Sequence, residues 1–294
     1  MSGDAATGAT APLTPLLLRT SGRSGSTLLM QLLATSDRVL FERAYPFEHR
    51  YLCHAYQLAR MVRLPFADDG TWNNEMLFHG FERRVGPLPY GEIEAFDRDA
   101  VADAAFERLW EAYSGGMRAR AGLPADAPAW YAEKVPQPVA EAAVERLGAR
   151  NLFLLRDPRD EMASVKAFNA KRGYAAFNWQ PDDDDLSYAR KVCADRRGFL
   201  QHLAGFEPSE RRHFLRYEDL VTDPAAETRR LSDWLGAELD HERAGADASI
   251  RAVHMTAPDA RASVGRWRTE LGPEVRALFR DELGEELERL GYAA

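Results

Sequence analysis

The sequence predicts an α/β fold in which a central parallel β-sheet is flanked by helices. Short apolar runs, such as residues 16–18 and 151–155, are typical of strands that are covered on both faces. Each run is followed by a stretch with helical spacing, and strands that alternate with helices favour a parallel sheet. With 294 residues, of which 45% are hydrophobic, the chain is long enough for one large domain. We therefore expect a single domain over residues 14–294, preceded by a disordered leader over residues 1–13.

The first half of the chain shows the strand–helix alternation after a small-residue turn. Four leucines between residues 28 and 33 lie on one face of the first helix. The segment 65–97 is aromatic and rich in turn residues, so we expect irregular structure or a lid there. In chain order, we expect a strand, a helix, a strand, two helices and a strand, over residues 15–19, 26–35, 39–41, 47–62, 99–121 and 130–132.

The second half repeats the alternation, and proline marks the start of several helices. Pro158 and Pro224 are expected in first helical turns, where the missing N–H has no acceptor to lose. The polar residues of interest follow strands, and ligands of such sheets bind at the carboxyl ends of the strands. After a helix that follows Pro136, we expect a strand, two helices, a strand and two helices, over residues 151–155, 158 onward, 186–203, 213–217, 224–236 and 273–290.

Bulk composition narrows the class of protein. The formal net charge is −8, whereas nucleic-acid binders more often have a basic excess, so we expect no nucleic-acid partner. The only cysteines, Cys53 and Cys193, are far apart, which favours free thiols over a disulfide or a zinc site. No signal-peptide pattern and no apolar run long enough to span a membrane is present. We therefore expect a cytoplasmic protein that has no membrane partner.

Residues 19–29, Arg-Thr-Ser-Gly-Arg-Ser-Gly-Ser-Thr-Leu-Leu, carry the clearest functional signal. They connect the first strand to the first helix, where backbone N–H groups and the helix dipole favour an anion. The segment has no Gly-Lys-Ser/Thr, so it is not the loop of ATP–magnesium enzymes. Arg23 lies inside the turn instead. The loop therefore predicts a phosphate-type ligand.

Several segments together resemble a sulfotransferase that uses 3′-phosphoadenosine-5′-phosphosulfate (PAPS). They are residues 22–29, Leu-Arg-Asp-Pro-Arg at 155–159, Glu-Lys-Val-Pro at 133–136, Tyr-Glu-Asp-Leu at 217–220 and Gly-Arg-Trp-Arg at 265–268. They occur in the family's order. The arginine in the loop is more similar to the carbohydrate, tyrosyl-protein and bacterial branches than to the animal cytosolic one. The resemblance implies a three-layer sandwich like that of P-loop nucleoside-triphosphate hydrolases.

The same resemblance implies residues that hold PAPS and its product, 3′-phosphoadenosine-5′-phosphate (PAP). Arg156 follows an apolar strand, where an unpaired arginine is costly, and a 3′-phosphate would supply a bidentate partner. An internal pair with Asp157 or Asp160 is the alternative. Trp267 could stack on the nucleotide or anchor the last helix, and Ser26 and Thr27 could also be helix caps. The expected contacts are Gly22, Arg23, Ser24, Gly25, Ser26, Thr27, Arg156, Ser164, Tyr217, Ser263, Arg266 and Trp267.

Sulfuryl transfer moves SO₃ in line from a phosphate to a hydroxyl, so fixed cations near the bridging oxygen would aid it. Arg23 is our candidate for that role, and no metal is expected. Glu42 is the first candidate for the general base, with His49 as the alternative. Lys134 is expected to contact the sulfuryl group or to close the site, unless it is a surface lysine.

The predicted acceptor is a hydroxyl of a carbohydrate or small-molecule natural product. We expect segments 45–63, 65–90 and 168–186 to line its pocket. A P-loop kinase is disfavoured because the loop lacks the lysine that binds the β- and γ-phosphates. A non-catalytic nucleotide-binding protein is disfavoured because Arg23, Glu42 and Lys134 are all present.

Overall fold

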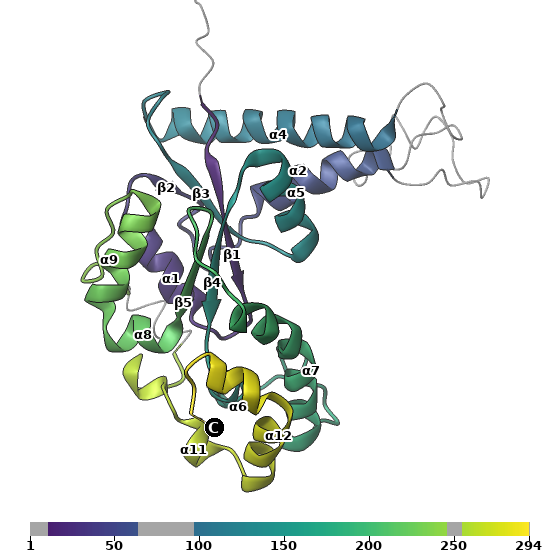
Figure 1. The fold of residues 1–294 in the computed structure, drawn as a ribbon, viewed down its shortest axis with the longest axis vertical. Helices are drawn as coiled ribbons and strands as arrows, with labels where there is room; N and C mark the ends of the chain where they lie inside the picture. The colour runs from purple at the N-terminus through teal and green to yellow at the C-terminus, as the bar shows by residue number, and fades with distance from the viewer. Residues whose placement is uncertain (1–10, 64–96, 246–254, 294) are drawn as a thin grey trace, which may run out of the picture. The chain divides into compact units, whose positions relative to one another are not determined.

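The computed structural model describes residues 11–63, 97–245 and 255–293. Its strands form one sheet in the order β2-β3-β1-β4-β5. Helices flank this parallel sheet, so the expected α/β fold is confirmed (Figure 1). Each of the expected strands is present, at β1 Thr14–Thr20, β2 Val39–Leu40, β3 Trp130–Lys134, β4 Arg150–Leu155 and β5 Arg212–Arg216.

The helices expected within the described residues are also present, with ends that differ by a few residues. The segment expected as irregular structure or a lid falls outside the described residues except for Asp97, whose side chain accepts from the amides of Asp99 and Ala100 at the start of a helix. The helices are α1 Ser26–Leu33, α2 Tyr51–Arg60, η1 Met61–Arg63, α4 Arg98–Arg120, α5 Gln137–Leu147, α6 Pro158–Arg172, α7 Asp185–Ala204, α8 Tyr217–Thr222, α9 Pro224–Leu235, η2 Arg261–Ser263, α11 Trp267–Glu270 and α12 Pro273–Arg289.

The chain divides into two compact units, and the boundary passes through β1 between Leu17 and Leu18. The first unit comprises Met1–Leu17, Leu40–Glu42 and Glu48–Arg150. The second comprises Leu18–Val39, Arg43–Phe47 and Asn151–Ala294. A single domain over residues 14–294 stays a prediction.

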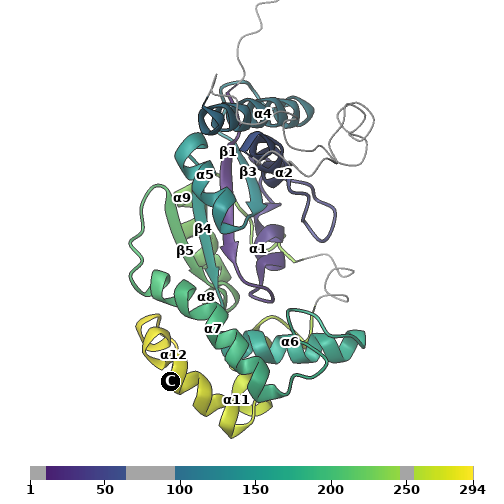
Figure 2. The ribbon, with the colours of Figure 1, turned by 90° about the vertical axis from the view of Figure 1, so that its right-hand side faces the viewer.

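The first unit has its own apolar core, to which α2, α4, α5 and β3 contribute. Trp110 of α4 is buried and donates its indole N–H to the backbone carbonyl of Leu13, 3.0 Å away. Its ring lies 5.2 Å from that of Tyr131 on β3. Figures 1 and 2 both show α2 and α4 side by side. This packing ties the long α4 to the strands.

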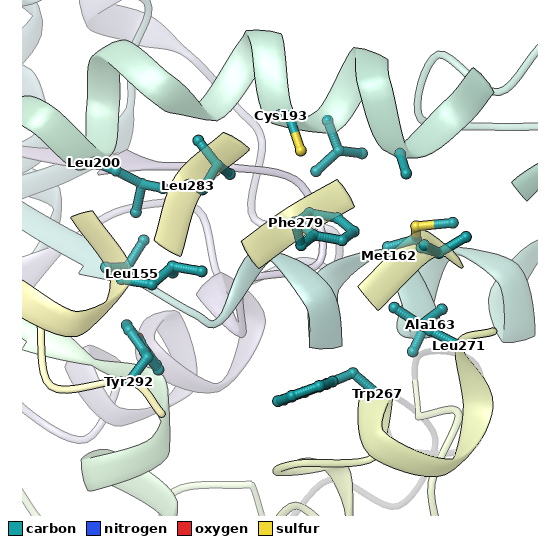
Figure 3. Close-up of a cluster of buried hydrophobic side chains, with 14 of the residues drawn as sticks. Leu155, Met162, Ala163, Cys193, Leu200, Trp267, Leu271, Phe279, Leu283 and Tyr292 are labelled. Carbon is teal, nitrogen blue, oxygen red and sulfur yellow. The ribbon is translucent and has the colours of Figure 1, made fainter. Parts of the chain in front are cut away.

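The second unit has a larger core, built mainly by α6, α7, α11 and α12. Helices α7 and α12 lie side by side in both ribbon views (Figures 1 and 2). Figure 3 shows Phe279 and Leu283 of α12 pointing into this cluster, with Trp267 and Tyr292 at its edge. Burial of this many apolar side chains, at roughly 1.5–3 kcal/mol each, stabilises the helices around the ends of β4 and β5.

The boundaries of two elements differ from the prediction. Tyr217 begins α8 rather than ending β5. Helix α2 begins at Tyr51 rather than at residue 47, because Phe47 has a positive φ of 60°, which an α-helix excludes. Periodicity alone does not detect such a change of backbone conformation.

Candidate functional site

A cavity of about 690 Å³ lies in the second unit, where β1, β4 and β5 end. Its wall contains the loop between β1 and α1, the residue after β4, and the first residue of α8. Helix α6 adds two polar side chains, and η2 adds one. The polar and charged residues around it include Arg23, Thr27, Gln31, Arg156, Ser164, Lys171, Tyr217 and Ser263.

The loop between β1 and α1 has the backbone of an anion cradle. Arg23 and Gly25 have positive φ values of 65° and 92°, which turn the chain sharply into α1. Ser24 is fully buried and donates to the carbonyl of Ser21 at 2.8 Å. The first N–H groups of a helix have no intrahelical acceptor, and together with the helix dipole they favour an anion at the start of a helix such as α1.

Gly25 is the N-cap of α1, and no side chain caps this helix. Ser26 is therefore the first helical residue. The alternative that Ser26 and Thr27 act as N-caps is wrong, because the chain enters α1 through the left-handed glycine. Thr27 lines the cavity and is buried.

The side chain of Arg23 is buried and contacts neighbouring side chains instead of solvent. Only 9% of it is exposed, and its Nε donates to Ser164 Oγ at 3.1 Å. Its guanidinium carbon lies 4.5 Å from the centre of the Phe168 ring. Burial, followed by repulsion from Arg156, lowers the pKa of Arg23 to about 10. Arg23 is therefore not a surface cation.

Arg156 is the second buried cation of the cavity, and 4% of it is exposed. Nη1 donates to the carbonyl of Arg23 at 3.0 Å and Nη2 to that of Ser263 at 2.7 Å. Its guanidinium lies 4.7 Å from the centre of the Tyr217 ring. The buried Nε of Arg156 has no hydrogen-bond partner among the residues that the structure describes.

Arg156 does not form the ion pair with Asp157 or Asp160 that was its alternative, because both carboxylates bind other groups. Asp157 accepts from Nε and Nη2 of Arg159, at 2.9 and 2.8 Å. Asp160 accepts from the backbone amides of Gly265 and Trp267. Arg159 is buried as well, so this arginine at the start of α6 is not a solvated surface residue.

Tyr217 and Ser263 close the cavity beside Arg156. The Tyr217 hydroxyl lies 2.9 Å from Ser263 Oγ. A Cβ atom added at Gly25 would lie 2.2 Å from Tyr217 Cδ2, and one added at Gly22 would lie 2.7 Å from Phe177 Cδ1. Both glycines therefore allow an aromatic ring to approach the loop closely.

Arg266 and Trp267 do not line the cavity, although Arg266 contacts Thr256, which does. Trp267 is 7% exposed and belongs to the apolar core, with the guanidinium of Arg159 3.8 Å from its ring centre (Figure 3). Trp267 therefore packs in the core, as the alternative to nucleotide stacking requires, and its contact with a nucleotide stays a prediction. Arg266 pairs with Glu270 at 2.8 Å and donates to Thr256 Oγ1 at 3.0 Å.

The candidate acid–base residues belong to the first unit. His49 Nδ1 lies 3.9 Å from Glu42 Oε2, so the two alternatives for the base contact each other. Lys134 Nζ lies 3.6 Å from Glu48 Oε1. Burial lowers the pKa of Lys134. Its side chain is 16% exposed, so it is not a plain surface lysine.

Glu133 is a residue whose role sequence reasoning missed. It is 2% exposed, and its carboxylate accepts the amides of Leu52 at 2.8 Å and Cys53 at 3.0 Å, at the start of α2. The Tyr131 hydroxyl, which has a single proton for two acceptors, lies 2.8 Å from Glu133 Oε2 and 3.1 Å from the carbonyl oxygen of His49. Only its place beside Lys134 in the Glu-Lys-Val-Pro segment indicated a function.

The described part of the chain contains no cluster of three or more acidic, histidine or cysteine side chains that could hold a metal. Among the helices with known placement, none has the length and apolarity needed to cross a membrane.

Taken together, the sheet, the loop before α1 and the two buried arginines define an α/β protein with a cavity lined by cationic side chains where its strands end. Residues 15–241 match the model of the sulfotransferase family, and the chain belongs to that family.

Two curated relatives are carbohydrate sulfotransferases. Carbohydrate sulfotransferase 1 of Danio rerio is 26% identical over 165 residues, which cover 51% of this chain and 39% of the relative. Carbohydrate sulfotransferase 4 of Mus musculus is 31% identical over 122 residues, which cover 38% of this chain and 31% of the relative. The matches thus span less than half the length of these relatives.

Solved structures agree on the fold. The sulfotransferase domain from the curacin biosynthetic pathway has a TM-score of 0.54 at 21% identity, and covers 96% of this chain and 99% of that domain. The sulfotransferase domain of the Synechococcus PCC 7002 olefin synthase has a TM-score of 0.51 at 18% identity, with 98% of each chain covered.

Proposed function

We propose that this protein transfers a sulfuryl group from PAPS to a hydroxyl of a carbohydrate or a small-molecule natural product, and releases PAP. The observation that carries the proposal is the pair of buried arginines, Arg23 and Arg156, in one cavity of a sulfotransferase-family chain. The names of the similar proteins support these acceptor classes: two are carbohydrate sulfotransferases, and one is a sulfotransferase domain from the curacin biosynthetic pathway.

The residues of the cavity fit a ligand that carries two phosphates. Arg156 is buried, bonds only to backbone carbonyls among the described groups, and retains an unsatisfied Nε. Arg156 also lowers the pKa of Arg23, so the two cations repel each other and an anion between them would relieve the repulsion. Charge-assisted hydrogen bonds to phosphate are the strong kind.

Roles can be derived for the residues at each end of the ligand. PAPS supplies the activated sulfuryl group on its 5′-phosphate. The loop amides from Gly22 to Thr27 would hold that phosphate, and Arg23 would stabilise the charge that develops on the bridging oxygen. Arg156 and Ser164 would hold the 3′-phosphate, with Tyr217 and Ser263 closing the nucleotide side.

The proton of the acceptor hydroxyl needs a base. The contact between Glu42 and His49 supports a paired role in which one residue accepts the proton and the other orients or stabilises it. Lys134, held beside Glu48, would supply positive charge on the acceptor side. The roles proposed for the Glu42–His49 pair and for Lys134 rest on contacts within the first unit.

Ligand binding tests the proposal first. PAP at about 100 times its Kd should stabilise the protein by about 2.7 kcal/mol, whereas ATP–Mg²⁺ should stabilise it far less. Stabilisation by ATP–Mg²⁺ alone would contradict the proposal and favour a kinase.

Activity tests it second. Incubation with labelled PAPS and a panel of hydroxyl acceptors should give a sulfated product and PAP, detected by mass spectrometry. The matched control is the Arg23→Ala protein, which should give little product. Binding of PAP without any product across sugars, phenols and aliphatic alcohols would favour a non-catalytic nucleotide-binding protein.

A further inference from the structure

Two residues of the cavity are the first residues after neighbouring strands. Arg156 follows β4 and Tyr217 follows β5, and the two strands are parallel, with Leu155 opposite Arg216. Their side chains contact each other across this edge of the sheet. The geometry of the cavity therefore depends on how the main chain leaves the two strands.

One buried carboxylate joins both exits. Glu218 is 7% exposed; its Oε1 accepts from the amide of Asp157 at 2.9 Å, and its Oε2 accepts from the Tyr292 hydroxyl at 2.9 Å. Asp157 is the next residue after Arg156, and Glu218 is the next after Tyr217. The carboxylate thus fixes the backbone beside both cavity residues.

The segment after α12 is shaped to present Tyr292 to Glu218. Gly291 has a φ of 78°, its amide donates to the carbonyl of Glu288, and the amide of Tyr292 donates to that of Leu287. This is the Schellman arrangement that turns a chain back at a helix end. Tyr292 is 6% exposed, and the guanidinium of Arg216 lies 4.3 Å from its ring centre.

A second bond ties the same segment to the start of α6. Arg159 donates from Nη2 to the carbonyl of Ala293 at 2.6 Å, while it also pairs with Asp157. The residues after α12 therefore contact both strand exits, although none of them lines the cavity.

We propose that Glu218 and Tyr292 are positioning residues, which hold Arg156 and Tyr217 in place for the 3′-phosphate of the nucleotide. The proposal rests on the proposed function, because that function assigns the 3′-phosphate to Arg156. Neither residue lines the cavity. Each acts through the backbone beside a residue that does.

The surroundings of the carboxylate support a dedicated role. Burial, with a further contribution from Asp157, raises the pKa of Glu218 to about 7, against the opposing effect of its hydrogen bonds. An apolar side chain at this position would avoid that desolvation. Buried ionisable groups of this kind are concentrated at functional sites.

The test compares two nucleotides that differ only in the 3′-phosphate. Isothermal titration gives the Kd of PAP and of adenosine 5′-phosphate for the full-length wild type and the Tyr292→Phe protein. Loss of one hydrogen bond should raise the Kd of PAP by about five- to tenfold, while that of adenosine 5′-phosphate changes less than about twofold. The Glu218→Gln protein can still accept from Asp157 and should stay within about twofold of wild type for both.

Tyr131→Phe is the matched control, because Tyr131 is also a buried tyrosine that donates to a buried glutamate, in the first unit. It should leave both Kd values unchanged. Tyr292→Phe that changes neither Kd, or raises both equally, would overturn the positioning role alone. A wild type that binds PAP no better than adenosine 5′-phosphate would overturn the assignment of Arg156 and the positioning role with it.

Discussion

The close approach of Tyr217 to Gly25 allows a sharp test of the cradle by the Gly25→Ala substitution. Two costs add at this position. A φ of 92° places an alanine in the left-handed region, at roughly 1–2 kcal/mol. The new Cβ would also lie 2.2 Å from the Tyr217 ring, so the ring has to move.

Movement of that ring is costly because the ring is held on two sides. Its hydroxyl lies 2.9 Å from Ser263 Oγ, and its face contacts Arg156. A cation–π contact at a desolvated site contributes on the order of 0.5–2 kcal/mol, and a hydrogen bond about 1 kcal/mol. We expect Gly25→Ala to lower the free energy of unfolding by about 3–4 kcal/mol and to raise the Kd of PAP by at least about tenfold.

Gly173→Ala separates the two costs. Gly173 has a φ of 73°, but an added Cβ would meet nothing within 4 Å. Urea unfolding should therefore show only the conformational cost, roughly 1–2 kcal/mol, and isothermal titration should show an unchanged Kd for PAP. Equal destabilisation by the two substitutions, together with equal PAP affinity, would refute the reasoning.

Three further predictions concern charge and protonation. Arg23→Ala should lower kcat by about 10²-fold or more, whereas Arg172→Ala, which removes an exposed arginine stacked on the same aromatic ring, should leave kcat unchanged; steady-state assays compare them. Burial lowers the pKa of His213 to about 4, so its contribution to stability is complete above pH 6.5 and is lost as the pH falls toward 4. This amounts to about 3 kcal/mol, and His213→Phe should remove that pH dependence in urea titrations from pH 4 to 7. In pH–rate profiles, both Glu42→Gln and His49→Ala should lower the rate, because the two residues are proposed to act as a pair; a residue whose substitution leaves the wild-type rate and profile intact is not the base.

Much of the fold could be predicted from the sequence because several strands contain a short apolar run and the longer helices are periodic. Asn151 to Leu155 is such a run, and Pro158 begins the next helix as expected. The short α8 and α11 could not be predicted in this way, because a helix of one turn has no period to detect. Their ends depend on tertiary contacts, such as the bonds from Asp160 to the start of α11.

The parts of the site that consist of short continuous segments, such as the loop between β1 and α1, could be predicted from the sequence. Arg23 and Arg156 do meet in one cavity, because each follows a strand of the same sheet. For Trp267 the sequence leaves stacking on a ligand and packing in the core open, because an aromatic side chain beside a basic loop suits both; the structure places it in the core. The links made by Glu218 and Glu133 join segments far apart in the chain, and a single sequence carries no signal for such pairs.

The mutual repulsion of Arg23 and Arg156 also bears on how turnover would proceed. In the proposed reaction, donor and product both carry a 3′- and a 5′-phosphate, so the cations that attract one hold the other nearly as well. Catalysis would then be limited by departure of the spent nucleotide, and accumulated PAP would compete with fresh donor. Inorganic sulfate or phosphate in a buffer would compete in the same way, so rates measured in such buffers would fall below those measured in their absence.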